Sequence, residues 1–417
     1  MKSSKTIFAL GVVTLAATAM ASDYDRPQGF QVGDRLTLKP YVSLSFTYDS
    51  NTDSTRHGKR GSSWMVNPGI GAEYKGDNWG ITGMAFYQYH AYNNYSSQLN
   101  RSTFGEKLAF NWRDSEVTEP GWTVKFDESY QKISQDDDMS EHNGRGVGRD
   151  RDEVKANGVV ERRLNQNIHL ALTGSYYMID YDNDVNKYAA MYGWKRATVG
   201  GEVGYMASRW TDFIVAGDYM WFEQDNDHVR GSNYYGSQTA RGKKIDSNST
   251  GWSIMGGIGT RATERLEYRL LGGYSRFDYG DGAKEIGGFV YQTSASWKIE
   301  ERLRFMLLGS SYYQPSETAY GSARKIYTLS AGLAKSFIRG KVTGTLDAAY
   351  RKEKTEYAEY AHDSYEIDYW TARVGVNYFL NRFFSFYARL EYQFTDSERQ
   401  SYEYDRWRGT VGVRISY

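Results

Sequence analysis

The 417-residue chain contains no cysteine and only 5 prolines. Without cysteine, the chain cannot gain rigidity from disulfides. Its 51 basic and 51 acidic residues balance, so it lacks the overall positive field typical of nucleic-acid-binding proteins. After the first 21 residues, no apolar run is long enough to form a membrane-spanning helix. These features argue against a disulfide scaffold, a nucleic-acid partner and a helical membrane protein.

Aromatic residues and glycine are abundant, with 37 Tyr, 18 Phe, 11 Trp and 43 Gly. Together with scarce proline, this composition favours pleated strands over helices. The mean hydropathy of −0.69 describes a polar chain that still carries much apolar ring surface. Such a combination is typical of a barrel in which only every second strand residue meets lipid.

The N-terminus predicts export. Lys2 and Lys5 precede an apolar run at residues 7–17, and Ala19-Met20-Ala21 forms a cleavage site of small residues. The run is too short for a membrane anchor. We therefore predict a signal peptide at residues 1–21, a periplasmic lead at residues 22–37 and a barrel domain at residues 38–417.

Period-two alternation dominates from Leu38 onward. In the first such segment Val42, Leu44, Phe46 and Tyr48 share one face, and small polar residues share the other. About 18 segments of about 10 residues follow this pattern, and a tilted strand of that length crosses a bilayer. The prediction is an all-β, antiparallel transmembrane barrel of about 18 strands, with 16 as the alternative.

The connections between these segments alternate between tight turns and long polar loops. Residues 76–78 and 381–382 are tight, whereas residues 49–61, 134–151 and 224–246 are long. This segregation predicts an up-and-down barrel with short periplasmic turns, long extracellular loops and both termini in the periplasm. A soluble β-sandwich is the alternative, but it has no reason to sort loop lengths in this way. The longest loops, 134–151 and 224–246, could fold inward as a constriction.

Tryptophans occur near strand ends, where aromatic girdles contact lipid headgroups. Nearly all share the parity of the apolar face, although cross-strand packing in a soluble sheet is the alternative. The predicted girdle consists of Trp64, Trp79, Trp112, Trp122, Trp194, Trp210, Trp221, Trp252, Trp297, Trp370 and Trp407.

The opposite parity assigns charged residues to the lumen, where they would tune the passage of solutes. Both signs are interspersed, which predicts weak ion selectivity. Arg373, Arg389, Arg408 and Arg414 could form a basic ladder, or could be neutralised by salt bridges to neighbouring strands. The pore-lining candidates are Lys75, Lys107, Arg113, Lys125, Asp127, Glu202, Asp218, Arg269, Asp347, Arg373, Arg389, Glu391, Arg408 and Arg414.

The last segment ends on an aromatic residue, as the C-terminal sorting signals of outer-membrane proteins do. Thr410, Gly412, Ile415 and Tyr417 stand at the spacing of such a signal. Tyr417 departs from the usual final Phe. The pattern predicts recognition by the barrel assembly machinery and location in the bacterial outer membrane.

Residues 36–51, LTLKPYVSLSFTYDSN, form a strand that is entered through Pro40 and ended by Tyr48-Asp49-Ser50-Asn51. The turn segments ATERLEY and IEERLRF begin later strands with Arg265-Leu266 and Arg302-Leu303. Together these segments resemble the outer-membrane β-barrel porin families, including the porin-2-like proteins. The resemblance implies a pore-like shape and location in the outer membrane.

No motif predicts catalysis, a metal site or a cofactor. Four of the histidines, at positions 57, 142, 228 and 362, fall in predicted loops, and none lies on an apolar face beside a nucleophile. An omptin-like protease or a calcium site at Asp136-Asp137-Asp138 or 225–228 is a minor alternative to solvated charge.

The predicted function is passive diffusion of small hydrophilic solutes with weak selectivity. Alternatives are a structural or adhesive barrel with tyrosine-rich loops such as residues 357–360, and a conduit for surface polysaccharide export. Expected partners are outer-membrane lipids, lipopolysaccharide and small solutes. The glycine pairs 200–201, 256–257 and 272–273 leave open a homotrimer with close contacts or a monomer with bent strands.

Overall fold

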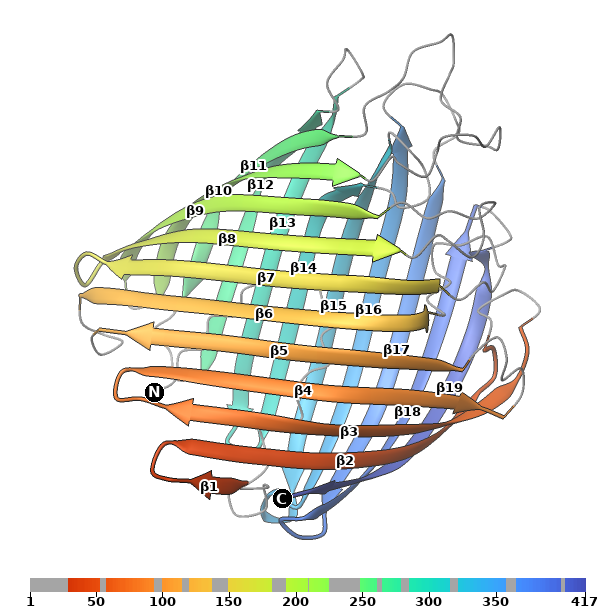
Figure 1. The fold of residues 1–417 in the computed structure, drawn as a ribbon. Coiled ribbons are helices and arrows are strands. Elements are labelled where there is room, and N and C mark those ends of the chain that lie inside the picture. The colour runs from red at the N-terminus through yellow and green to blue at the C-terminus, as the bar shows by residue number, and fades with distance from the viewer. Residues whose placement is uncertain are drawn as a thin grey trace.

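The protein is described by a computed structural model, and in the residues that it describes all but one of the regular elements are strands (Figure 1). No helix in the described part of the chain is long and apolar enough to cross a membrane. The predicted signal peptide, the four histidines of the loops and the acidic segments 137–138 and 225–228 lie outside the described residues. The structure describes residues 29–52, 58–93, 100–114, 120–136, 149–181, 193–208, 210–224, 248–260, 265–278, 285–315, 322–357, 365–398 and 402–417.

Eighteen strands, β2 to β19, form the barrel, and each pairs antiparallel with the next. A short 3-10 helix, Ile338–Gly340, joins β15 to β16. The strands are β2 (Leu36–Asp49), β3 (Gly61–Lys75), β4 (Trp79–Tyr92), β5 (Arg101–Arg113), β6 (Gly121–Asp136), β7 (Arg149–Arg163), β8 (Ile168–Tyr181), β9 (Trp194–Ser208), β10 (Thr211–Gln224), β11 (Ser249–Thr260), β12 (Leu266–Asp278), β13 (Ile286–Glu300), β14 (Leu303–Pro315), β15 (Ser322–Phe337), β16 (Val342–Tyr357), β17 (Glu366–Phe379), β18 (Phe384–Ser397) and β19 (Tyr404–Ser416).

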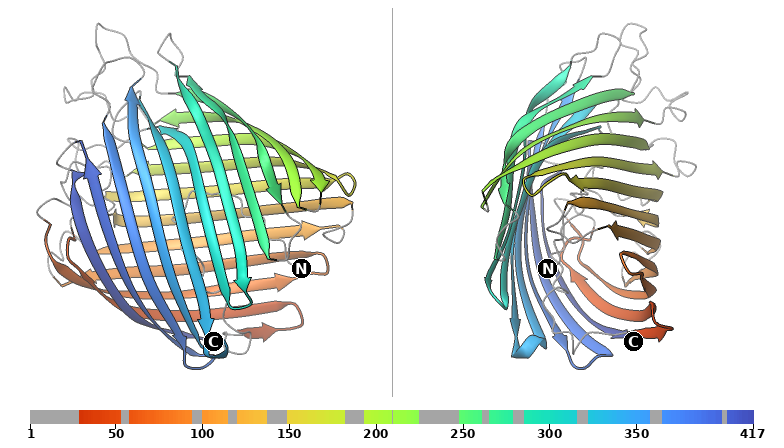
Figure 2. Two further views of the ribbon diagram at one scale, coloured as in Figure 1. Left: turned by 180° about the vertical axis from the view of Figure 1, so that it is seen from behind. Right: turned by 90° about the vertical axis from the view of Figure 1, so that its left-hand side faces the viewer.

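The barrel closes between its last and first strands, because β19 pairs with β2 from Ser416↔Tyr41 to Arg408↔Asp49. This closure confirms the predicted antiparallel up-and-down barrel of about 18 strands. The strands are longer than expected, ranging from 12 residues in β11 to 16 in β6. Strong strand tilt makes the near wall, β2 to β9, cross the far wall, β13 to β17, in projection (Figures 1 and 2).

The two faces of each strand differ in chemistry as the alternation predicts. On β2 the side chains of Val42 and Leu44 are 45% and 41% exposed on the outer face, whereas Ser43 and Ser45 are buried on the lumenal face. Exposed apolar side chains occur on every barrel strand except β14 and form the belt that contacts lipid.

Trp194 corrects the predicted girdle. It lies on the lumenal face of β9 and is only 1% exposed, packed among other aromatic side chains. Val199 and Val203 face outward on the same strand, so even-numbered positions of β9 face the lumen. The other ten tryptophans lie on the outer face or, at Trp210, in an exposed turn.

A short strand, β1 (Phe30–Val32), lies within the segment predicted as a periplasmic lead. It pairs with Leu36–Leu38 of β2, beyond the point that β19 reaches. The ring of Phe30 stacks on Tyr417 at 3.7 Å, and the Tyr417 N–H donates to the Pro40 carbonyl at 3.1 Å. The N-terminal strand therefore covers the periplasmic end of the closing seam.

The wall overlaps itself between β13 and β14. Their ladder ends at Gln292↔Ser310, although β14 continues its pairing with β15 as far as Pro315↔Ala323. Tyr313 has the parity of the lipid face but is only 2% exposed, and it packs with Val290, which faces the lumen from β13. The loop ends of β14 and β15 therefore lie on the lumenal side of β13.

Candidate functional site: the lumenal face

The strand register places all fourteen pore-lining candidates on the lumenal face. Residues directly opposite each other in an antiparallel ladder share a face, and several candidates are such partners, including Asp347↔Arg373 and Glu391↔Arg408. Whether a solute path passes them is a prediction that the register alone does not test.

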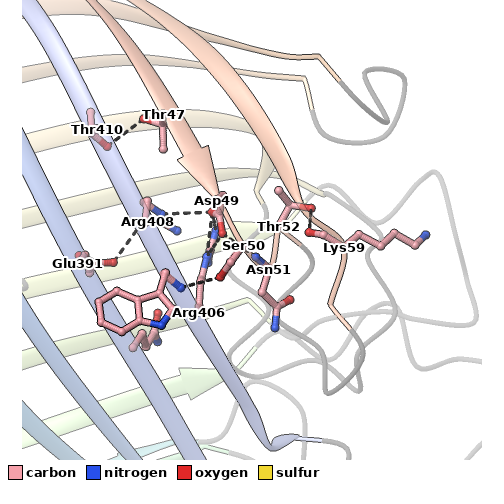
Figure 3. Close-up of polar contacts among 12 residues, drawn as sticks. Thr47, Asp49, Ser50, Asn51, Thr52, Lys59, Glu391, Arg406, Arg408 and Thr410 are labelled. Carbon is pink, nitrogen blue, oxygen red and sulfur yellow. Dashed lines mark hydrogen bonds and ion pairs between the residues drawn. The ribbon is translucent and has the colours of Figure 1, made fainter.

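Five charged residues on β17, β18, β19 and β2 form one continuous network, which we call the ion-pair chain: Arg373, Glu391, Arg408, Asp49 and Arg406. Figure 3 shows Glu391, Arg408, Asp49 and Arg406. Glu391 contacts both Arg373 and Arg408, the latter at 3.5 Å. Asp49 receives Arg408 at 3.3 Å and the Arg406 Nε at 2.9 Å. The chain therefore links four strands across the closing seam.

Asp49 is buried in this network, at 4% exposure, and accepts further hydrogen bonds that offset the loss of water. The Asn51 N–H donates to it at 3.0 Å. Beside it, the hydroxyls of Thr47 and Thr410 lie 3.0 Å apart (Figure 3). Asp49 is absent from the lumenal residues predicted from the sequence, because the predicted first loop begins at this residue. Its odd position on β2, shared with Ser45 and Thr47, places it on the lumenal face.

The predicted basic ladder is divided. Arg373 and Arg408 are neutralised in the ion-pair chain, as the salt-bridge alternative expects. Arg389 is exposed to the lumen and forms no ion pair within the described residues. Arg414 lies over the ring of Tyr41 at 4.0 Å from its centroid. Two of the four cations, Arg389 and Arg414, therefore make no direct ion pair in the described part of the barrel, although Arg389 interacts electrostatically with Asp347.

A group of apolar side chains on the lumenal side of β8 to β15, here called the aromatic cluster, contrasts with the ion-pair chain. Phe277 is 0% and Trp194 1% exposed. The rings of Phe222 and Phe277 lie 4.7 Å apart, and Tyr177 meets Trp194 edge-on at 4.8 Å. The buried members are Ile179, Tyr181, Trp194, Phe222, Phe277, Ile286, Val290, Tyr313 and Ala323, with Tyr177, Met220 and Met255 packed against them.

Further carboxylates in the lumen are also paired. Glu353 contacts Arg324 at 3.1 Å and also Arg351, and these two arginines lie on β15 and β16 beside the aromatic cluster. Glu202 accepts from Arg269 at 2.7 Å. Glu353 and Glu202 therefore each have at least one cationic neighbour.

The remaining candidates lie on β3 to β6 and on β10. Lys75 contacts Glu73 at 3.2 Å, and Asp127 accepts from Asn157 at 2.8 Å. Asp218 accepts from the Ser253 hydroxyl. Lys107 is exposed to the lumen, Arg113 lies at the turn end of β5, and Lys125 lies on the lumenal face of β6.

The predicted sorting residues occupy the seam. Thr410 and Gly412 face the lumen, where Gly412 lies beneath the ring of Tyr387. Ile415 faces lipid at 47% exposure. Tyr417 contacts Phe30 and Phe383. Their role in sorting is a prediction.

No group of three or more His, Asp or Glu side chains suited to a metal ion occurs in the described ranges. His90 lies beside Gln88 on the lumenal face, and His169 lies 3.3 Å from Glu202 at the turn end of β8. Neither histidine is arranged with a nucleophile, so the described site offers no evident catalytic set.

Residues 231–417, which include β11 to β19, match the family model described as "Putative beta-barrel porin 2". The C-terminal part of the chain is thus similar to this porin family, and the whole chain is an antiparallel β-barrel of the bacterial outer membrane. The matched part contains the closing strand β19, most of the ion-pair chain and half of the barrel wall. No curated protein matches the chain.

Solved structures with remote similarity are also outer-membrane barrels. The outer-membrane protein OpdK of Pseudomonas aeruginosa, solved with vanillate, is 13% identical, with a TM-score of 0.41 over 91% of this chain and 99% of that one. The siderophore receptor PirA of Pseudomonas aeruginosa is 8% identical, with a TM-score of 0.43 over 93% and 81%. PirA of Acinetobacter baumannii is 9% identical, with a TM-score of 0.43 over the same shares.

Proposed function

We propose that the protein is a passive outer-membrane channel for small hydrophilic solutes, with weak selectivity. The supporting observation is the chemistry of the lumenal face, where charged and hydroxyl side chains recur on nearly every strand while the apolar belt faces outward. A barrel of this strand number encloses space that side chains alone do not fill. Both signs of charge are present, so no strong preference for anions or cations follows.

Planar-bilayer recording on the purified mature protein tests the channel. We expect discrete current steps, and a zero-current potential in a salt gradient that indicates weak selectivity. Folded protein is identified by its heat-modifiable migration in gels. If folded protein gives no current and does not render liposomes permeable to small sugars, the channel proposal is wrong and the structural or adhesive barrel is favoured.

We also propose that residues 1–21 are removed on export, that residues 22–37 form the periplasmic lead, and that the barrel assembly machinery recognises the C-terminal strand. Mass determination of protein isolated from outer membranes should identify Ser22 as the first residue. Deleting Tyr417 should reduce the amount of folded barrel in the membrane, whereas Tyr417→Phe should not. Equal amounts of all three proteins would contradict the sorting role.

A further inference from the structure

Arg196 lies on the lumenal face of β9, in surroundings that differ from those of the arginines that form ion pairs. The ladders place Tyr177 of β8 and Phe222 of β10 directly opposite it, one on each side. Trp194 lies two residues earlier on the same face. The guanidinium carbon is 5.9 Å from the ring centroids of Tyr177 and Trp194 and 6.0 Å from that of Phe222.

These rings are themselves fixed. Trp194 and Phe222 are buried in the aromatic cluster, and the Tyr177 hydroxyl donates to Glu153 at 3.0 Å. Cation–π attraction to three fixed rings therefore holds the guanidinium in position without a carboxylate. Rigid placement matters because a preorganised cation binds an anion with little further loss of entropy.

The hydrogen-bonding capacity of Arg196 is left unused by the residues that the structure describes. Among the described residues it forms no hydrogen bond or ion pair, and its side chain is only partly buried. Asp218, the acidic lumenal residue of the adjacent strand, attracts Arg196 electrostatically but makes no direct ion pair with it, and its carboxylate accepts from Ser253. Glu153 is engaged by Lys155, Arg151 and Tyr177. The planar donor fork of Arg196 therefore has no hydrogen-bonded acceptor among the described residues, and its charge is only partly offset by Asp218.

Apolar side chains lie next to this cation. Met220 faces the lumen from β10 and Met255 from β11, both partly exposed at the edge of the aromatic cluster. Flexible thioether side chains adapt to differently shaped apolar groups. The site thus combines one fixed anion-binding group with an adaptable apolar surface.

The part of the wall formed by β15 and β16 adds positive charge near Arg196. Arg324 and Arg351 lie on the lumenal face of β15 and β16 and share one carboxylate, that of Glu353. The ends of β14 and β15 turn inward toward the aromatic cluster. Cations therefore outnumber carboxylates where the two walls approach each other.

We infer that Arg196 forms a solute-binding subsite for small organic carboxylates that carry an apolar body. The carboxylate binds the guanidinium through two parallel hydrogen bonds, and the body contacts Met220, Met255 and Tyr177. The inference deepens the proposed channel function by giving the class of solute that the channel retains. It needs no covalent step and no cofactor.

Binding of sodium benzoate to the folded protein in detergent micelles, followed by isothermal titration calorimetry, tests the inference. Benzamide has the same shape without the charge and serves as the matched ligand control. We expect binding of benzoate and at least a tenfold weaker response to benzamide. We expect Arg196→Gln to weaken benzoate binding at least tenfold, and Arg196→Lys to weaken it less because the charge remains.

Arg389→Gln is the matched protein control, because Arg389 is a lumenal arginine that makes no cation–π contact within the described residues. It should leave benzoate binding within twofold of the unsubstituted protein. Equal affinities for benzoate and benzamide, equal affinities of the unsubstituted and Arg196→Gln proteins, or no benzoate binding at all would overturn the inference. If Arg196→Gln does not fold, Arg196→Lys and the ligand pair carry the test.

The same preparation separates this inference from the channel proposal. Protein that binds benzoate through Arg196 but is silent in planar bilayers contradicts the channel alone. Protein that conducts but responds equally to benzoate and benzamide contradicts the subsite alone.

Discussion

The lumen has two regions of contrasting chemistry. On β17, β18, β19 and β2 the ion-pair chain joins oppositely charged side chains along the wall, and the ladders there run without a break. On β8 to β15 the aromatic cluster gathers apolar side chains, and the ladder between β13 and β14 ends early.

The difference reflects how each kind of side chain avoids an unfavourable environment. Charged groups on adjacent strands satisfy one another in register, so the wall stays continuous and the side chains follow it. Apolar groups facing a wet lumen lower their free energy by packing together, and this packing draws strand ends inward. The closing seam is thus held by charge, and the overlapping wall by apolar contact.

The largest expected effect comes from breaking the ion-pair chain at its buried carboxylate. Asp49→Asn removes the negative charge that Arg406 and Arg408 share, and Arg406 is only 7% exposed. We expect a loss of about 3–5 kcal/mol of unfolding free energy, measured by urea titration in lipid vesicles. Thr47→Val, which removes only the hydroxyl contact beside it, should cost about 1 kcal/mol. Equal losses of unfolding free energy in the two variants would show that the ion-pair chain does not stabilise the closing seam.

The aromatic cluster should be nearly as sensitive. Phe277→Ala deletes a fully buried ring and should cost about 3 kcal/mol in the same titration. Phe289→Ala, on the lipid face of the adjacent strand at 62% exposure, is the control and should cost clearly less. A loss at Phe289 as large as that at Phe277 would contradict the view that the cluster is a packed core.

Close strand approach behind the cluster should be disturbed at Gly257 on β11. A Cβ there would overlap the Leu270 carbonyl of β12, so Gly257→Ala should cost about 1–3 kcal/mol. Gly158→Ala, where a Cβ meets nothing within 4 Å, should be almost neutral. This result would favour the bent-strand explanation of the glycine pair 256–257. Similar stability of the two variants would contradict it.

The smallest effect on stability is expected at the unpaired end of the predicted ladder. Arg389→Glu should change the unfolding free energy by less than about 0.5 kcal/mol, because no ion pair is lost. It should nevertheless move the zero-current potential toward cation preference, since a lumenal charge changes sign. Arg373→Glu, in contrast, should greatly lower the unfolding free energy, because it breaks the ion pair with Glu391. An unchanged potential in Arg389→Glu would place this residue away from the ion path.

Much of the fold could be predicted from the chain because period-two alternation assigns faces residue by residue. Lys107, Asp218 and Arg414 were placed on the lumenal face in this way, and the register agrees. Trp194 was misplaced because tryptophan near a strand end usually marks the lipid interface. The parity of Arg196 and Glu202 on the same strand was the signal that could have corrected it.

The candidate site was less predictable. Asp49 and Arg406 are separated by most of the chain, and only barrel closure brings their side chains together. Arg196 had no distinguishing sequence motif, because its rings come from three different strands.

The sequence by itself determined the antiparallel barrel, its strand number and the face to which each charged residue points, since these depend on local alternation and loop length. The tertiary structure alone decided which charges neutralise one another, where the wall turns inward and which arginine lies among aromatic rings without a direct ion pair in the described residues. Those outcomes depend on the register between distant strands and on desolvation in a shared lumen, and neither is encoded in any single segment.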